Sequence, residues 1–207
     1  MHPLGRKERD KLLRKADILK AAVRIFATKG YHKATMSDIA EEAQYAVGTL
    51  YLYFKNKGSL YITLIEEKVN ELIATVKRKV GEIKSPRDKL KILIETQLSY
   101  FEENEDFFRI YFSERGELRW TIKDKIPKQA MDKFLEYLDY ITNLIKEAQK
   151  KRFIEKEFDP KRVAYILAGM MNATIIPWLR ERPLEKKGLK DLSTFVLNVF
   201  YKGVGTR

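Results

Sequence analysis

Apolar residues recur at helical spacing in the first part of the chain. One stripe consists of Leu19, Ala22, Val23 and Phe26. Because an i, i+3, i+4, i+7 spacing puts these side chains on one face, it predicts a helix from about Arg9 to Lys29. Gly30 follows, and glycine commonly occupies the position just after a helix end. We therefore expect the first helix to end at Gly30.

Two shorter helices are predicted next. The apolar face of the second is formed by Met36, Ile39, Ala40 and Ala43. Either Thr35 or Ser37 can cap its N-terminus, since a hydroxyl there accepts a hydrogen bond from a free backbone N–H. A turn at Gln44–Tyr45 then leads to a third helix over Ala46–Tyr53.

From Ser59 onward the apolar repeats become longer. They predict helices at about 59–81, 86–104, 106–115, 127–151, 160–179 and 189–202. Met131 and Phe134 are expected to face the core, and Pro177 to end or kink its helix. Since no segment has a convincing strand pattern, the predicted fold is all-α with about nine helices. We divide the chain into residues 1–58 and residues 59–207.

Charge is concentrated at the N-terminal end of the 207-residue chain. The net charge is +12, and residues 1–58 carry 12 Lys/Arg against 6 Asp/Glu. A basic N-terminal unit fits a polyanionic partner such as DNA, although charge alone would fit an anionic membrane surface nearly as well. The chain has no cysteine, which excludes disulfides and thiolate zinc sites and is compatible with the cytoplasm.

Several other classes of protein do not fit the sequence. The apolar stretch Val163–Leu179 is shorter than a typical membrane span and is interrupted by polar residues and Pro177, so we expect a buried helix and no membrane partner. His2 and His32 belong to no metal or catalytic motif, and no glycine-rich phosphate loop is present. We expect no enzyme activity, no cofactor and no metal.

The segment Thr35–Lys57, TMSDIAEEAQYAVGTLYLYFKNK, has the layout of a helix-turn-helix. In such a motif the second helix lies in the major groove of DNA and flanking groups bind phosphates. Leu50 and Phe54 already supply an inward face, so Tyr51 and Tyr53 should point elsewhere. The sequence therefore predicts a DNA-binding unit.

Three sequence blocks in this region resemble the TetR family of bacterial transcriptional regulators. They are FATKGY, TMSDIA and TLYLYFKNK, and the similarity covers about Asp17–Tyr61. One difference from the family pattern lies in the turn, where Gln44-Tyr45 replaces the usual Gly-Val. Gln44 must then adopt a left-handed or similar conformation, which glycine reaches more easily.

The resemblance implies a homodimer that pairs through its last two helices. It also implies a C-terminal core that binds a small hydrophobic effector, and two DNA-binding heads. Effector binding is expected to move the helix that starts near Ser59, swing the heads apart and release a double-stranded DNA operator.

The resemblance also implies which residues contact DNA. Thr35 and Ser37 are candidates for phosphate contacts or simple caps, and Val47, Gly48 and Thr49 for base contacts. Further candidates are Lys33, Tyr45, Tyr51, Tyr53, Lys55 and Lys57. Tyr45 is left open between groove contact and turn packing, and Lys55 between phosphate contact and solvation. The basic stretch Arg6–Lys15 is left open between an arm in the minor groove and a disordered tail.

An aromatic and methionine-rich set in the second unit supplies candidate ligand contacts. Its members are Phe107, Phe108, Arg109, Tyr111, Phe112, Trp120, Met170, Met171, Asn172 and Trp178. Aromatic stripes at helical spacing are more often core than ligand walls, but a large apolar pocket with a few polar groups is the usual design of such sites. Arg109 and Asn172 are candidates to hold a polar head group.

These observations leave several functional interpretations. The leading one is a dimeric repressor that a hydrophobic small molecule releases from a palindromic operator. An alternative is an acyl-CoA-responsive or fatty-acid-responsive regulator of lipid metabolism, because FFRIYFSERG resembles that branch of the family. Two others are an effector-independent DNA-binding protein and an acyl-chain carrier whose DNA-binding head is vestigial.

Overall fold

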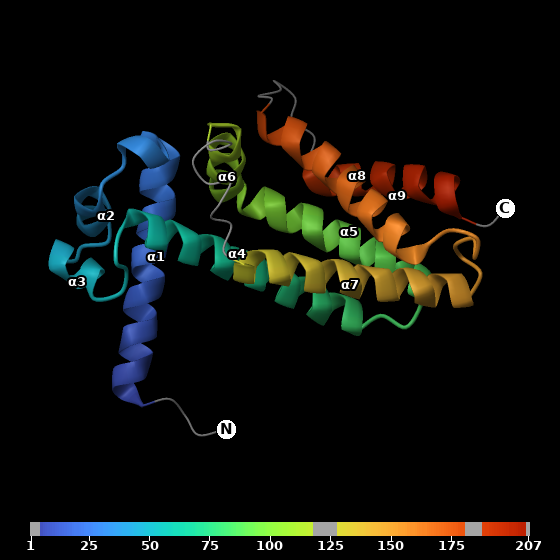
Figure 1. The fold of residues 1–207 in the computed structure, drawn as a ribbon, viewed down its shortest axis with the longest axis horizontal. Coiled ribbons are helices and arrows are strands. Elements are labelled where there is room, and N and C mark those ends of the chain that lie inside the picture. The colour runs from blue at the N-terminus through green and yellow to red at the C-terminus, as the bar shows by residue number, and fades with distance from the viewer. Residues whose placement is uncertain (1–4, 118–127, 181–187, 206–207) are drawn as a thin grey trace.

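The computed structural model describes residues 5–117, 128–180 and 188–205, and the regular elements there are all α-helices. They are α1 (Arg6–Lys33), α2 (Met36–Glu42), α3 (Val47–Tyr51), α4 (Lys57–Gly81), α5 (Pro86–Glu103), α6 (Glu105–Glu117), α7 (Lys128–Lys150), α8 (Pro160–Arg180) and α9 (Leu189–Val204). In Figure 1 the first three form a head at the left and the others form an elongated body. The all-α prediction with about nine helices is confirmed.

Local signals explain where several of these helices begin. Ser85 accepts a hydrogen bond from the Asp88 amide and precedes Pro86, which suits the first turn of α5. Asp159 accepts one from the Arg162 amide at 2.7 Å at the start of α8. The expectation that Pro177 could end its helix was wrong, because α8 continues to Arg180. A proline has no N–H to donate to the carbonyl four residues earlier, here that of Ala173, so Pro177 removes one hydrogen bond from α8 without ending it. The kink offered as the alternative stays a prediction.

Gly30 breaks the long first helix, as predicted. Its φ of 76° and ψ of 157° interrupt the helical backbone between two segments that together make up α1. L-amino acids with a side chain rarely adopt such a φ, which explains why the residue here is glycine. The amide of Ala34 then donates to the Gly30 carbonyl at 3.1 Å and leads the chain into the cap of α2.

Lys57 holds this break against the start of α4. Its Nζ donates to the backbone carbonyls of Tyr31 at 2.6 Å, His32 at 3.1 Å and Ala34 at 2.8 Å. It also lies 4.6 Å from the centre of the Tyr31 ring, within range of a cation–π interaction. We call this arrangement the Lys57 clamp. It ties the helix that enters the body to the end of α1.

A capping box fixes the start of α2. Thr35 Oγ1 accepts the Asp38 amide at 3.1 Å, and Asp38 Oδ2 accepts the Thr35 amide at 2.9 Å. Lys29 Nζ pairs with Asp38 Oδ1 at 2.8 Å. The bond from Lys29 and those from Thr35 favour the charged carboxylate and lower the Asp38 pKa to about 2.

The head and the body share part of their apolar core. Phe26, Ile39 and Leu50 are fully buried in the head, and Leu60 of α4 is buried with them. Phe26 also meets the ring of Tyr61 edge-on. The first turns of α4 therefore pack as part of the head, even though the predicted boundary follows residue 58.

The body is built around α5. This helix packs against α4, α7, α8 and α9, and Leu90, Leu93, Ile94 and Leu98 on it are fully buried. The prediction that Met131 and Phe134 face the core was wrong, because both are exposed. Helical spacing places these residues on the inward face of α7, but neighbouring helices cover that face only from Tyr137 onward.

Among the residues described, α8 is the one helix long and apolar enough to cross a membrane by length and composition. Its Leu167, Met171 and Ile175 are fully buried, and the helix packs against α7 and α9. These contacts fit the core helix that was expected there.

The clamp generates a prediction about stability. Lys57→Ala removes three charge-assisted hydrogen bonds and is expected to lower the free energy of unfolding by about 2 kcal/mol or more. Lys55→Ala is the matched control, because Lys55 is exposed and no hydrogen bond or ion pair links it to the residues described. Chemical denaturation measures both, and equal stabilities for the two variants would contradict a structural role for Lys57.

The Asp38 capping box generates a pH prediction. Folding lowers the pKa of Asp38 from 3.8 to about 2, so its stabilisation is complete above pH 4 and is lost as the pH falls through 2. Asp38→Asn should therefore be less stable than wild type at pH 6, with a gap that closes between pH 4 and about 2. Urea denaturation across this range measures the gap, and a constant difference would show that the carboxylate charge contributes nothing.

Candidate DNA-contact surface

Helix α3, which the sequence analysis predicts to lie in the major groove and which we call the recognition helix, turns Leu50 inward and its opposite face to solvent. Leu50 is fully buried and Phe54 is 3% exposed, whereas Tyr51 is 53% exposed. Val47 and Gly48 are also exposed, and Thr49 is half-buried. A side chain at Gly48 would meet nothing within 4 Å, so packing inside the chain does not require a glycine here. The helix therefore exposes the small residues Val47 and Gly48 at its N-terminal end, the end that contacts bases in helix-turn-helix proteins, with the half-buried Thr49 next to them and the exposed Tyr51 at its C-terminal end.

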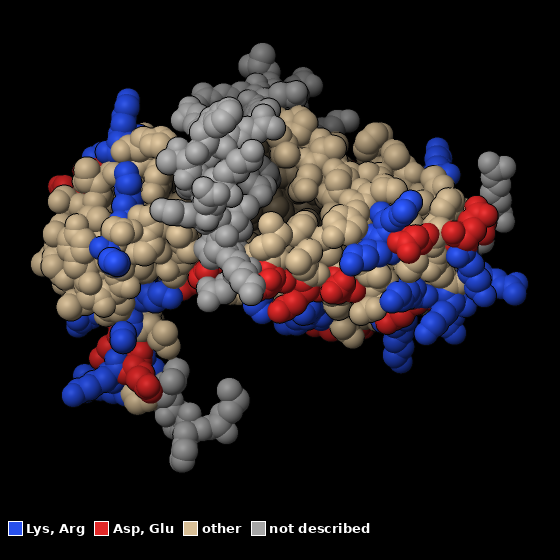
Figure 2. Space-filling model, in the orientation of Figure 1, with Lys and Arg blue, Asp and Glu red and all other residues tan. Residues whose placement is uncertain are grey.

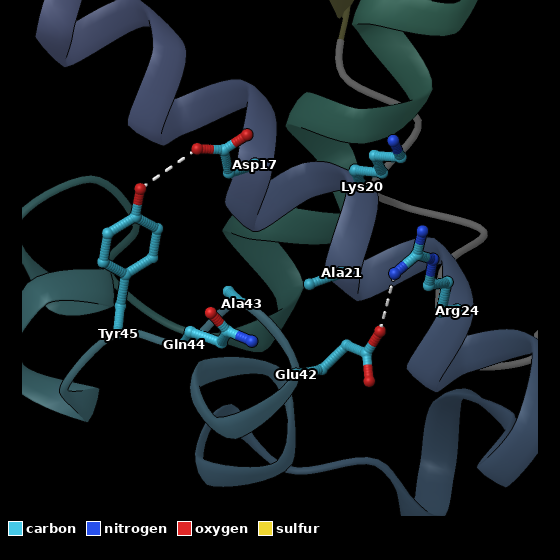
Figure 3. A pocket seen from close by; sticks show the side chains of 8 residues that line it. All are labelled: Asp17, Lys20, Ala21, Arg24, Glu42, Ala43, Gln44 and Tyr45. Carbon is cyan, nitrogen blue, oxygen red and sulfur yellow. Dashed lines mark hydrogen bonds and ion pairs between the residues drawn. The ribbon is translucent and has the colours of Figure 1, made fainter.

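The turn before α3 has the strained conformation expected of it. Gln44 has a φ of 58°, and the amide of Tyr45 donates to the Ala40 carbonyl at 2.9 Å. The Tyr45 hydroxyl donates to Asp17 Oδ2 of α1 at 3.0 Å, as Figure 3 shows. This bond and the carboxylate charge raise the pKa of Tyr45, and Arg14 opposes them. The sequence analysis left Tyr45 open between groove contact and turn packing. The hydrogen bond to Asp17 is a contact of the second kind.

A small polar pocket lies between α1 and this turn. It has a volume of about 420 Å³. Figure 3 shows its lining of Asp17, Lys20, Ala21, Arg24, Glu42, Ala43, Gln44 and Tyr45. Arg24 pairs with Glu42 at 2.9 Å across it. The Tyr45–Asp17 and Arg24–Glu42 contacts tie the turn and the end of α2 to α1, and so they help to position α3.

The other predicted DNA contacts, apart from Lys57, are at least partly accessible to solvent. Lys33, Thr35, Ser37 and Lys55 are exposed, and Tyr53 is half-buried. Thr35 is at the same time the cap of α2, so capping and exposure coexist there.

Lys57 differs from this set, because an ammonium has three N–H donors and the clamp uses all three. In this conformation Lys57 cannot also donate to a phosphate. Sequence spacing could not show this, since the acceptors lie more than 20 residues upstream.

The predicted ligand residues that the structure describes lie on α6 and α8, which pack against each other. Phe107, Phe108, Met171 and Trp178 are buried, Met170 and Tyr111 are half-buried, and Asn172 is exposed. Phe108 stacks on Phe101 with ring centres 3.8 Å apart. Arg109 pairs with Glu105 one turn away. The side chain of Phe112 and the whole of Trp120 lie outside the described residues. Packing accounts for the buried aromatic residues, and Asn172 is not an interior polar group.

A buried polar pair was missed by the sequence analysis. The Tyr137 hydroxyl of α7 donates to Gln97 Oε1 of α5 at 2.7 Å inside the core. Burial raises the pKa of Tyr137, so its phenol stays protonated. The available signal was the position of Gln97 and Tyr137 at helical spacing from the apolar residues of α5 and α7. These two side chains add polar groups to the interior of the body.

A larger groove of about 680 Å³ lies where the head meets the body. Leu19 and Val23 of α1, Leu64 of α4 and Phe107 of α6 give it apolar walls, and charged side chains surround them. Lys15 of α1 pairs with Glu67 of α4 at 2.7 Å nearby. Of the members of the aromatic set whose side chains the structure describes, Phe107 lines this groove. Among the described residues, no group of three or more potential metal ligands is found.

The last two helices expose an apolar surface. Tyr165 and Ile166 on α8 and Phe195 and Val199 on α9 are between 46% and 64% exposed, while Val196 and Phe200 of α9 are buried. Helix α9 thus has one apolar face in the core and a second one on the surface.

Comparison with known proteins places these features in a family. Residues 18–64 match the bacterial regulatory proteins of the tetR family, and residues 65–203 match the C-terminal region of YsiA-like proteins. The chain is 27% identical over 187 residues to the fatty acid metabolism regulator protein of Bacillus subtilis strain 168, covering 90% of this chain and 93% of that protein.

Two solved structures are similar over nearly the whole chain. One is the transcriptional regulator FadR from Bacillus subtilis in complex with stearoyl-CoA, with a TM-score of 0.78, 27% identity and coverage of 91% of this chain and 98% of that one. The other is the fatty acid degradation regulator FadR from Bacillus halodurans, with a TM-score of 0.75, 25% identity and coverage of 94% and 97%. The chain therefore belongs to the TetR family of bacterial transcriptional regulators, a family of DNA-binding proteins and not of enzymes, and carries a YsiA-like C-terminal body.

Proposed function

We propose that this protein is a cytoplasmic, homodimeric repressor whose affinity for DNA is lowered by a long-chain acyl-CoA. The main support for the effector is the similarity to FadR from Bacillus subtilis, which was solved with stearoyl-CoA. The similarity extends through the body, because residues 65–203 match the YsiA-like C-terminal region. The acyl-CoA-responsive alternative thus has better support than an unspecified hydrophobic effector.

The outward face of α3 is the observation that carries the DNA-binding part of the proposal. Val47, Gly48 and Thr49 contact base edges in the major groove, where the Thr49 methyl group and hydroxyl can both be used. Tyr51 and the exposed groups around it bind phosphates. Buried Leu50 fixes the rotation of the helix, so these groups cannot turn inward. The other phosphate ligands are Lys33, Thr35, Ser37, Tyr53 and Lys55.

The apolar surface of α8 and α9 supports dimerisation through the last two helices. Tyr165, Ile166, Phe195 and Val199 are each about half exposed on two helices that pack against each other. Apolar side chains exposed together on neighbouring helices are typical of a protein–protein interface. A two-fold axis through this surface gives two heads, and each inserts α3 into one of two major grooves about 34–36 Å apart. The operator is then a palindrome.

The effector acts on the spacing of the heads. An acyl chain inside the body displaces α4, whose first turn is fixed to the head by the Lys57 clamp. The groove between α1, α4 and α6 leaves open space where the head meets the body, and the head changes its angle toward that space. The ligand favours the spacing that does not fit DNA, and it shifts the population by its difference in affinity for the two states.

A binding experiment tests the proposal directly. Duplexes selected from a random library by the wild-type protein should share a palindromic motif, and Tyr51→Ala should bind them at least tenfold more weakly. Asn143→Ala is the matched control, because Asn143 is exposed on α7 in the body. Fluorescence anisotropy of a labelled duplex gives the dissociation constants.

Adding stearoyl-CoA to the complex should release the duplex, whereas coenzyme A alone should not. Selected duplexes that share no motif would contradict sequence-specific binding. Specific binding that is unchanged by stearoyl-CoA would contradict the effector and favour an effector-independent protein.

A further inference from the structure

The N-terminal turns of α1 form a projecting helix. Residues Arg6–Lys15 are the first ten residues of α1, and all of them except Lys15 are exposed. In Figure 1 this end of α1 extends beyond the rest of the head with no other helix beside it. Of the two possibilities considered from sequence for Arg6–Lys15, a disordered tail is therefore wrong, because the segment is a helix continuous with the part of α1 that packs in the head.

This projecting helix carries cations without partners. It contains six Lys/Arg against Glu8 and Asp10. Within the described part of the chain its one ion pair joins Lys15 to Glu67. Figure 2 shows the projecting end as charged side chains that neighbouring elements leave uncovered. The remaining cations are free to bind an external anion.

Three of these cations lie on one face of the helix. Lys7, Lys11 and Arg14 follow an i, i+4, i+7 spacing, and the same stripe continues to Ile18 and Ala21, which are buried in the head. The face of α1 that packs against the head is thus cationic where the helix leaves the head. Glu8 and Asp10 lie to either side of this stripe.

The cationic stripe begins beside the recognition helix. Asp17 holds Tyr45, which lies two residues before α3, and Arg14 is close enough to Tyr45 to influence its ionisation. At a rise of 1.5 Å per residue, Lys11 and Lys7 lie about 9 and 15 Å further along the axis from Asp17. The stripe therefore extends outward from the end of α3 that enters the groove.

We propose that the helix Arg6–Lys15 is a second DNA contact, in which Lys7, Lys11 and Arg14 bind backbone phosphates flanking the groove occupied by α3. This inference rests on the proposed function of the head. Regularly spaced phosphates suit a row of unpaired cations, and such contacts add affinity and salt dependence without reading sequence. The recognition helix selects the site, and the projecting helix lengthens the stretch of DNA that the protein covers.

An anionic membrane fits this helix less well. A helix that lies on a membrane needs a continuous apolar face opposite its cations. Leu12 and Leu13 are exposed, at 54% and 64%, but they are neighbours in sequence and point about 100° apart. They form no such face, so charge complementarity favours DNA.

The test compares two triple variants with the same change in charge. One is Lys7→Gln, Lys11→Gln, Arg14→Gln, and its control is Lys146→Gln, Lys150→Gln, Lys151→Gln, at exposed positions in the body. Glutamine keeps a high helix propensity, and circular dichroism verifies equal helix content. Fluorescence anisotropy measures binding to a duplex selected by the wild type. Two lengths of this duplex are compared, the selected motif alone and the motif with about six further base pairs on each side. Each is measured from about 50 to 200 mM salt.

We call the triple variant at Lys7, Lys11 and Arg14 the arm variant. For each phosphate contact removed, its negative slope of log K against log salt concentration should become less steep by about 0.9. The arm variant should also lose the wild type's preference for the longer duplex, while the control keeps both and both variants keep the same sequence preference. An arm variant with the wild-type slope and length preference overturns this inference alone. This inference is also overturned if the arm variant loses binding to phosphatidylglycerol vesicles but binds DNA as the wild type does. A wild type that binds no duplex overturns the proposed function as well.

Discussion

The contact between the Lys57 ammonium and the end of α1 determines how this molecule is assembled. At Gly30 the backbone leaves the helix, and the carbonyls of Tyr31, His32 and Ala34 that follow accept the three N–H groups of one side chain. Lys57 is also the first residue of α4. One charged group therefore satisfies the backbone at the break and fixes the direction in which α4 leaves the head.

A continuous set of contacts extends from this clamp into the body. Leu60 and Tyr61 pack into the head, and farther along α4 the carbonyl of Lys68 lies 3.0 Å from the hydroxyl of Tyr100 on α5. The same hydroxyl lies 2.9 Å from Glu71 Oε2. Since α5 packs against most other helices of the body, a rearrangement around it can reach α4 through these bonds. In the proposed mechanism the clamp at the first residue of α4 passes this movement to the head, because its three hydrogen bonds leave Lys57 little freedom to slide.

The parts of this structure that depend on local chemistry were predictable from sequence. Gly30, the left-handed Gln44 and the inward Leu50 each follow from what a short segment of backbone or a helical repeat requires. The parts that depend on distant partners were not. A periodic stripe shows which face of α7 or α9 is apolar, but not whether this chain covers it, so Met131 is exposed although it lies on the apolar face. Likewise, the lysine at position 57 looks the same in sequence whether its ammonium meets a phosphate or three carbonyls.

The central claim is that an acyl-CoA in the body changes the spacing of the heads through α4 and the Lys57 clamp. The chain has no cysteine, so a single Glu41→Cys on the exposed surface of α2 places one spin label on each head of the dimer. Pulsed electron–electron double resonance then gives the distribution of distances between the two spin labels, and so between the heads. The account predicts that stearoyl-CoA shifts this distribution in the wild-type background and shifts it much less when Lys57 is replaced by alanine. An unchanged distribution in the wild-type background would contradict it.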